Sequence, residues 1–262
     1  MKDISLTHLL DTAICAAQAA GKHALANKDR RRESNETFAH DVKLVLDVEC
    51  QKIAEEVIAA EFPEHDILGE EDVRHNEADG YEWIIDPIDG TMNYTHGFPY
   101  WCVSIAVRYR EKVLAGCVYA PEFGDYYTAH IEEPAKLNGE PIHTSDTGHL
   151  DESLIFTGLS KHMQSANEPH FEMFKMLALN TRKVRINGSA ALDLCHVAAG
   201  SSDGYLENSI YLWDHAAAGL IAEQAGAVLS IYPQHNEPYA CSVLCANKNL
   251  IEGLRAVYTK CS

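Results

Sequence analysis

Apolar and polar positions divide the first part of the chain into two helices with a polar stretch between them. Over residues 4–27, and again over residues 47–61, apolar side chains recur three or four positions apart. That spacing is typical of a helix with one buried face. Phe62-Pro63 ends the second helix, because proline cannot continue it. Residues 27–40 are polar and charged without a period, and therefore predict a surface loop.

Short apolar runs replace the helical pattern from residue 66 onward. The runs 66–69 and 83–85 each predict a strand that ends in acidic residues, and the runs 101–109, 113–120 and 125–130 predict an antiparallel meander. Further strands are expected at 153–157, 203–207, 227–232 and 241–245, and helices at 168–179, 189–199, 214–225 and 248–259. This order predicts an α+β protein in which helices lie between and outside layered sheets.

Composition narrows the classes of function. Of the 262 residues, 46% are apolar and 23% are charged, which is ordinary for a soluble globular protein. The net charge of −18 argues against direct contact with nucleic-acid phosphates or anionic membranes. There is no apolar run of about twenty residues, no signal-like start, and no C-x-x-C among the eight cysteines. These features predict a cytoplasmic protein with reduced, mostly buried thiols.

The candidate chemistry is densest in the stretch W-I-I-D-P-I-D-G-T. An apolar strand presents Asp86 at its end, and Pro87, which has no amide hydrogen, is expected to end the strand ladder there. Asp89 follows, and Gly90 permits a tight turn. Two carboxylates and the carbonyl between them can then converge on one point, which is the oxygen ligation that Mg²⁺ prefers. The amides of Gly90 and Thr91 can face a phosphate oxygen if a helix starts there. An Asp-Gly turn with a helix cap is the purely structural alternative.

Two more acidic positions offer ligands to the same chemistry. In Gly69-Glu70-Glu71-Asp72 the adjacent acids repel one another. The segment is therefore either a solvated loop or the neighbour of a cation, where a carboxylate can orient a water. Asp214 stands at the expected cap of a helix, and either caps it or supplies a third metal carboxylate.

Polar groups for a substrate come from the second half of the chain. Gly188-Ser189-Ala190 opens a helix whose amides can meet a polyol or a phosphate. Glu207, at the end of the expected strand 203–207, can accept hydrogen bonds from hydroxyls. The chain has no P-loop, G-x-G-x-x-G or G-x-S-x-G motif, which argues against nucleoside triphosphatases, dinucleotide enzymes and serine hydrolases.

Four segments together resemble the inositol monophosphatase family, over roughly residues 5–260. They are Gly69-Glu70-Glu71, Asp86-Pro-Ile-Asp-Gly-Thr91-x-Asn93, Gly188-Ser-Ala-Ala191 and Trp213-Asp-x-Ala-Ala. The resemblance implies a homodimer and the layered αβαβα sandwich of the inositol monophosphatase and fructose-1,6-bisphosphatase type. It also implies one such domain over 1–262, with a metal-binding N-terminal half of about 1–145 and a C-terminal half of about 146–262.

The same resemblance implies a role for each site residue. Glu70, Asp86 and the Ile88 carbonyl would hold one Mg²⁺, and Asp86, Asp89 and Asp214 a second. Thr91 with Asp47 and Glu70 would position the attacking water. The residues implied in holding the substrate are Ile88, Asp89, Gly90, Thr91, Gly188, Ser189, Ala190, Glu207 and Asp214. Two or three Mg²⁺ ions are implied, with Mn²⁺ as an alternative metal and Li⁺ as an inhibitor.

One stretch departs from the family pattern. A Val-Thr pair usually precedes the aspartate that corresponds to Asp47, whereas here Leu44 replaces the threonine and Lys43 is added. The departure bears on the behaviour of the flap and on a third metal, and leaves Asp47 and Thr91 in place.

The expected activity is Mg²⁺-dependent hydrolysis of a small phosphorylated polyol or sugar, with inositol monophosphate favoured. Met92-Asn93 follows the D-G-T element, where 3′(2′),5′-bisphosphate nucleotidases usually carry Lys-Glu. That nucleotidase activity stays open as an alternative, with fructose-1,6-bisphosphatase and histidinol-phosphatase activities. A different class also stays open, in which the chain is a non-catalytic regulatory protein-binding partner, as some relatives are for transcription complexes.

Overall fold

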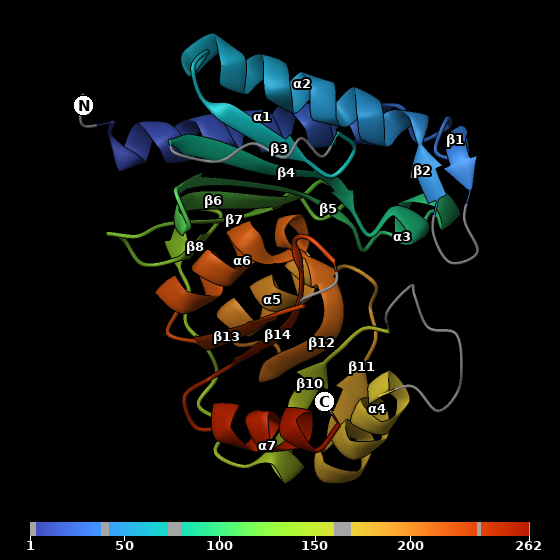
Figure 1. Cartoon of the computed structure of the whole chain (residues 1–262), viewed down its shortest axis with the longest axis vertical. Coiled ribbons are helices and arrows are strands. Elements are labelled where there is room, and N and C mark those ends of the chain that lie inside the picture. The colour runs from blue at the N-terminus through green and yellow to red at the C-terminus, as the bar shows by residue number, and fades with distance from the viewer. Residues whose placement is uncertain (1–3, 38–41, 73–79, 160–168, 235–236, 262) are drawn as a thin grey trace.

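The layered sandwich predicted from the sequence is the observed architecture. The structure is a computed structural model that describes residues 4–37, 42–72, 80–159, 169–234 and 237–261. Its elements stack as helices, sheet, helices, sheet and helices (Figure 1). Among the described helices, none combines the length and apolarity needed to cross a membrane. All eight cysteines are free thiols and six of them are buried, as expected.

Helices α1 (Leu6–Ala26) and α2 (Val45–Glu61) form the outer layer beside the first sheet (Figure 1). The buried face of α1 is made mainly of alanines, namely Ala13, Ala16, Ala17, Ala20 and Ala24. These small side chains let the helix lie close to the strands. At Gly21 an added Cβ would come within 2.7 Å of the Tyr119 ring. Both helices are confirmed to within two residues at each end.

The first sheet has seven strands, and the predicted meander forms its centre. In spatial order they are β3 (Asp66–Gly69), β4 (Tyr81–Asp89), β5 (Cys102–Tyr109), β6 (Lys112–Ala120), β7 (Asp125–His130), β8 (Lys136–Leu137) and β9 (Glu140–Pro141). β3 and β4 run parallel and every later pair is antiparallel. The parallel start brings the carboxyl ends of β3 and β4, with their acids, to the same edge.

Strand β4 continues past the proline that was expected to end it. Asp86 pairs with Ser104, and Asp89 pairs with Cys102. Between these pairs, two residues of β4 lie opposite one residue of β5, which is a β-bulge. Pro87 has no amide hydrogen, and it lies within the bulge, where the hydrogen-bond ladder is already interrupted. The strand can therefore accommodate this proline. The expectation that the ladder stops at Pro87 was wrong.

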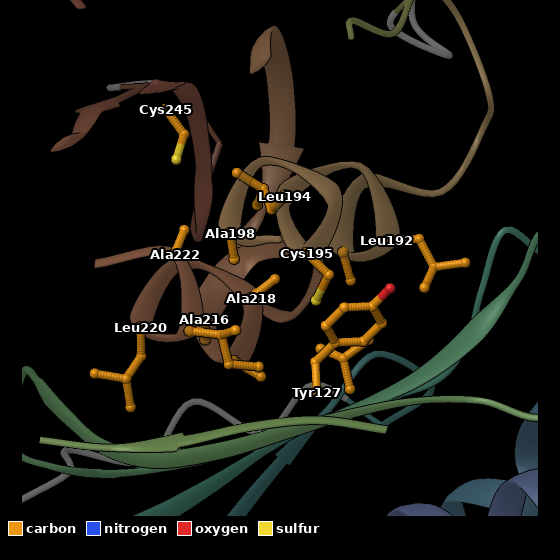
Figure 2. Packing of buried hydrophobic residues seen from close by; sticks show 14 of the residues in the cluster. Tyr127, Leu192, Leu194, Cys195, Ala198, Ala216, Ala218, Leu220, Ala222 and Cys245 are labelled. Carbon is orange, nitrogen blue, oxygen red and sulfur yellow. The ribbon is translucent and has the colours of Figure 1, made fainter. Parts of the chain in front are cut away.

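Helices α5 (Ala190–Ala198) and α6 (Leu212–Gln224) fill the space between the two sheets. Figure 2 shows their apolar side chains between the two sheets, with Tyr127 of β7 on the side of the first sheet and Cys245 of β14 on the side of the second. Both helices are buried almost all round, because each has a sheet on two sides. Small residues make this close packing feasible. A Cβ at Gly116 of β6 would lie 2.9 Å from the Cα of Ala217.

The second sheet is mixed and has five strands. In spatial order they are β11 (Lys183–Arg185), β10 (Leu154–Phe156), β12 (Gly204–Tyr211), β14 (Ala240–Ala246) and β13 (Val228–Pro233). Helices α4 (Pro169–Asn180) and α7 (Ile251–Cys261) cover its outer face (Figure 1). The remaining elements are the hairpin of β1 (Ser34–Thr37) and β2 (Val42–Leu44), the short helix α3 (Thr91–His96) and the 3₁₀ turn η1 (Leu150–Glu152).

Three expectations about local structure need correction. The polar stretch 27–40 is only partly a loop, since residues 34–37 form one strand of the β1–β2 hairpin and residues 38–40 lie outside the described residues. Glu207 lies within β12 rather than at its end, because a bulge between Glu207 and Ile210 carries the strand on. Asp214 is the third residue of α6, whose N-cap is Tyr211.

Candidate active site

Three aspartates from two elements meet at one point beneath the first sheet. Asp86 and Asp89 come from either side of the bulge in β4, and Asp214 comes from the first turn of α6, which packs against β4 and β5. One carboxylate oxygen of each lies within 4.8 Å of the others. Asp86 is 1% exposed and Asp89 is 8% exposed. The structure thus brings three of the predicted metal ligands together.

The charge around Asp86 is strongly negative. Burial raises the pKa of Asp86 well above its usual range, and the charges of Glu70, Asp89, Asp214 and Asp47 raise it further, in that order. Buried like charges at this spacing oppose one another unless a proton or a cation lies between them. The donors are carboxylate oxygens without sulfur or nitrogen, which suits Mg²⁺. The donor set therefore fits the predicted metal.

Asp89 is fixed by the start of α5. Its Oδ2 accepts hydrogen bonds from the Ser189 hydroxyl at 2.5 Å and the Ala191 amide at 2.8 Å, with the Cys102 thiol at 3.6 Å. Burial raises the pKa of Asp89, and these donors pull the pKa back down. The first turn of α5 thus directs its amides at a protein carboxylate. The Ala191 amide, which donates to Asp89, is therefore not available to donate fully to a substrate.

Asp214 and Asp47 are held by the same local device. Asp214 Oδ2 accepts the Tyr211 amide at 2.7 Å, and Asp47 Oδ2 accepts the Leu44 amide at 2.8 Å. Each aspartate is the third residue of its helix, and its bond caps the N-terminal residue. Capping uses one carboxylate oxygen, so the structural and the functional explanations of Asp214 are compatible.

The bulge and the turn after it place the other predicted groups near the cluster. The Glu70 amide donates to the Ile85 carbonyl at 3.1 Å, which keeps Glu70 beside the end of β4. The Thr91 hydroxyl donates to the Ile88 carbonyl at 3.0 Å. Gly90 has φ +91°, and a Cβ there would lie 3.0 Å from the Tyr100 carbonyl oxygen. Glycine is therefore required at the turn.

A pocket of about 270 Å³ opens beside the aspartate cluster. Six predicted residues border it: Asp89, Gly188, Ser189, Ala190, Glu207 and Asp214. The other lining residues were not predicted from the sequence; they are Gly158, Leu159, Ile186, Asp193, Ser209, Ile210 and Tyr211. Asp193 had a detectable signal, since it lies three residues after Ala190 on one helical face.

Glu207 lies against the backbone of the segment after β10. A Cβ at Gly158 would come within 2.1 Å of the Glu207 carboxylate, so only glycine leaves room for it. The Tyr205 hydroxyl donates to Glu207 Oε2 at 2.5 Å. Burial raises the pKa of Glu207 to about 8, although the Tyr205 bond works in the opposite direction.

Lys43, the departure noted in the sequence, contacts the acidic loop after β3. Its Nζ lies 2.7 Å from Glu71 Oε2 and donates to the Glu71 carbonyl at 3.0 Å. The Gln51 side chain accepts the Glu71 amide at 3.0 Å. Lys43 therefore ties the β1–β2 hairpin to the residue next to Glu70.

Comparison with known proteins gives a consistent result. The model of the "Inositol monophosphatase family" matches residues 5–261. An inositol monophosphatase from Dictyostelium discoideum is 33% identical, over 97% of this chain and 96% of its own length. A protein from Vibrio cholerae named Nus factor SuhB is 35% identical, over 85% and 84%. The solved structure of an inositol monophosphatase from Anabaena superposes with a TM-score of 0.85 at 32% identity, covering 97% of this chain and 96% of the other.

Proposed function

This chain belongs to the inositol monophosphatase family, and from that premise we propose that it is a Mg²⁺-dependent phosphatase of small phosphomonoesters, with inositol monophosphate as the favoured substrate. One observation supports the proposal most strongly. The cluster of Asp86, Asp89 and Asp214 borders a pocket whose further lining offers hydroxyl-binding groups. We call the three aspartates the metal end. The alcohol end comprises Glu207, Asp193 and residues 186–189.

At the metal end, Asp86, Asp89, Asp214, Glu70 and the Ile88 carbonyl would hold the metal. Mg²⁺ held by these oxygens would balance the phosphate charge and make the attacking water easier to deprotonate. The protein's own contribution is position. The capping bond fixes Asp214, and the first turn of α5 fixes Asp89.

The attacking water would be oriented by Glu70, Thr91 and Asp47. The Thr91 hydroxyl donates its hydrogen to the Ile88 carbonyl, but its oxygen can still accept one from a water. A water held by these groups would lie near Asp86, whose pKa is raised in part by the negative charges of Glu70 and Asp47. That charge favours removal of a proton from the water.

The alcohol part of the substrate would lie against Glu207, Ser189 and Ala190. Glu207 accepts hydrogen bonds from hydroxyls, and its own bond from Tyr205 holds the carboxylate in one orientation. The predicted amides at Gly90 and Thr91 face the phosphate in this proposal. The predicted homodimer, cytoplasmic location and Li⁺ inhibition remain part of it and need separate tests.

The test is phosphate release from a substrate panel with and without Mg²⁺. The panel contains inositol 1-phosphate, fructose 1,6-bisphosphate, histidinol phosphate, adenosine 3′,5′-bisphosphate and glycerol 2-phosphate. We expect Mg²⁺-dependent release, with the highest kcat/KM for inositol 1-phosphate. A higher kcat/KM for another member would transfer the assignment to that branch. Asp151→Asn, an exposed acid on η1, is the matched control for changes in the cluster.

A second function class is supported by the names of the relatives. The similar proteins include the Vibrio cholerae protein named a Nus factor. A regulatory, protein-binding role is therefore a second candidate. Absence of phosphate release from every panel member would favour it. The expectation that the chain does not bind nucleic acid directly rests on its charge of −18, and fluorescence anisotropy with labelled RNA would test it.

A further inference from the structure

A buried carboxylate outside the metal end has two donors of its own. Asp193 lies in the first turn of α5, borders the pocket and is 1% exposed. Its Oδ1 accepts the Tyr100 hydroxyl at 2.6 Å and the Asn187 amide group at 2.8 Å. Burial raises the pKa of Asp193 to about 7, while the two donors lower it. The three side chains come from α5, the segment before β5 and the segment before α5.

A fourth side chain closes this network into a ring. Asn93 of α3 donates through Nδ2 to the Tyr100 carbonyl at 2.7 Å and to the Asn187 carbonyl at 2.8 Å. Tyr100 and Asn187 are thus each held twice, once through the backbone and once through the side chain. Gly188 continues the restraint. It has φ +85°, and a Cβ there would lie 3.1 Å from Asn93 Nδ2. The ring therefore leaves residues 186–189 little freedom.

Those residues form one wall of the alcohol end. Ile186, Gly188 and Ser189 all border the pocket, together with Asp193 itself. The Ile186 side chain is 45% exposed and faces no core, so its position depends on the backbone that holds it. None of the four ring residues belongs to the aspartate cluster. The ring can therefore shape the alcohol end without supplying a metal ligand.

We propose that Asn93, Tyr100, Asn187 and Asp193 form a positioning ring that fixes the wall at residues 186–189 and thereby selects the alcohol portion of the substrate. The inference rests on the proposed phosphatase function. Physically, the ring works because a buried acceptor that loses a donor destabilises its surroundings. The wall would then take several positions instead of one, and discrimination among alcohols would fall.

The test uses Tyr100→Phe, which removes one hydroxyl from the ring and keeps the Ser189 bond to Asp89 intact. Two substrates are compared: inositol 1-phosphate, and 4-nitrophenyl phosphate, whose leaving group has no hydroxyl for the wall to recognise. We expect kcat/KM for inositol 1-phosphate to fall about tenfold, mainly through KM, as suits one lost bond to a buried carboxylate. For 4-nitrophenyl phosphate the ratio should stay within about twofold of wild type.

Two further variants separate positioning from general loosening. Tyr94→Phe removes the hydroxyl of a buried tyrosine in α3 that donates to the Ala24 carbonyl of α1 at 2.7 Å and does not line the pocket. It should change neither ratio by more than about twofold. Asp193→Asn keeps the Oδ1 acceptor and should therefore keep substrate selectivity close to that of the wild type. Asp193→Leu removes the acceptor and should lose that selectivity.

The outcomes are distinguishable. Equal losses on both substrates, a fall in kcat at unchanged KM, or the same shift in Tyr94→Phe would overturn the ring's selective role while leaving the phosphatase proposal in place. Failure of the wild-type protein to hydrolyse either ester would overturn both.

Discussion

The two ends of the pocket hold buried carboxylates under opposite conditions. At the metal end three aspartates bring their oxygens within 4.8 Å, and their mutual repulsion helps to raise the pKa of Asp86. At the alcohol end each carboxylate has a phenol donor: Tyr205 for Glu207 and Tyr100 for Asp193. The metal end is therefore incomplete without a cation, whereas the alcohol end is satisfied by the chain itself.

The metal-free site is therefore destabilised by charge repulsion at the metal end and not at the alcohol end. Removing a charge from the metal end should stabilise the metal-free protein and abolish activity. Removing a donor from the alcohol end should destabilise the protein and alter substrate binding more than turnover. The two kinds of substitution should therefore change the free energy of unfolding in opposite directions.

The largest effect is expected from Asp86→Asn. We expect kcat to fall by about 10³-fold or more, because the carboxylate common to both predicted metal sites is lost. In the absence of Mg²⁺ the unfolding temperature should rise by about 2–4 °C, which corresponds to about 1 kcal/mol of relieved repulsion. Steady-state phosphate release and calorimetry provide the two readings. A lower unfolding temperature without Mg²⁺ would contradict the strained metal end.

Tyr205→Phe should give the opposite pattern. Glu207 then loses its donor inside the pocket, and the free energy of unfolding should fall by about 1–3 kcal/mol. KM for inositol 1-phosphate should rise while kcat changes little. Urea unfolding without Mg²⁺ measures the first effect, and Tyr258→Phe in the outer helix layer is the control. Unchanged stability would mean that the Tyr205 bond contributes nothing.

The pH dependence of stability tests the burial of Glu207 at the alcohol end. Burial raises the pKa of Glu207 from 4.5 to about 8. Because the folded state binds its proton more tightly than the unfolded state, the stabilisation is complete below pH 4.5 and is lost as the pH rises towards 8. Glu207→Gln should therefore gain stability relative to wild type between pH 5 and pH 8.5. A difference between the two proteins that stays constant across this range would refute the shift.

The smallest effect is expected at Lys43, which lies in strand β2 of the hairpin and contacts Glu71 of the acidic loop. Its ion pair with Glu71 is partly exposed, so Lys43→Met should change the free energy of unfolding by less than about 1 kcal/mol. Phosphate release should stay within about threefold of wild type, since the Lys43 ammonium pairs with Glu71, whose carboxylate is not one of the proposed metal ligands. A much larger loss would give Lys43 a direct role at the metal end.

Local sequence patterns predicted much of the metal end. The apolar strand before Asp86 and the turn at Gly90 can be recognised within nine residues, and the structure places both as expected. The bulge at Pro87 was missed because a pattern within one strand does not reveal the register of its neighbour. Asp214 was displaced from cap to third helical residue for a similar reason, since both positions favour aspartate.

The alcohol end was harder to predict because its contacts are distant in sequence. Tyr100 and Asp193 are 93 positions apart, and no local pattern in the sequence connects the two residues. The β1–β2 hairpin was missed because its strands are polar and lack the alternation that marks a half-buried strand. Long-range hydrogen bonds define this part of the pocket, and these become visible only in the fold.

In the proposed function the aspartate cluster binds Mg²⁺, and hydrolysis depends on that bound ion. The most direct measurement is a Mg²⁺ titration of wild type and Asp89→Asn, followed both by unfolding temperature and by phosphate release from inositol 1-phosphate. For the wild type we predict that both signals rise with the same midpoint, because one binding event stabilises the fold and enables the reaction. For Asp89→Asn both responses should disappear. Phosphate release without Mg²⁺ would contradict this proposal. So would a wild-type unfolding temperature that does not change as Mg²⁺ is added.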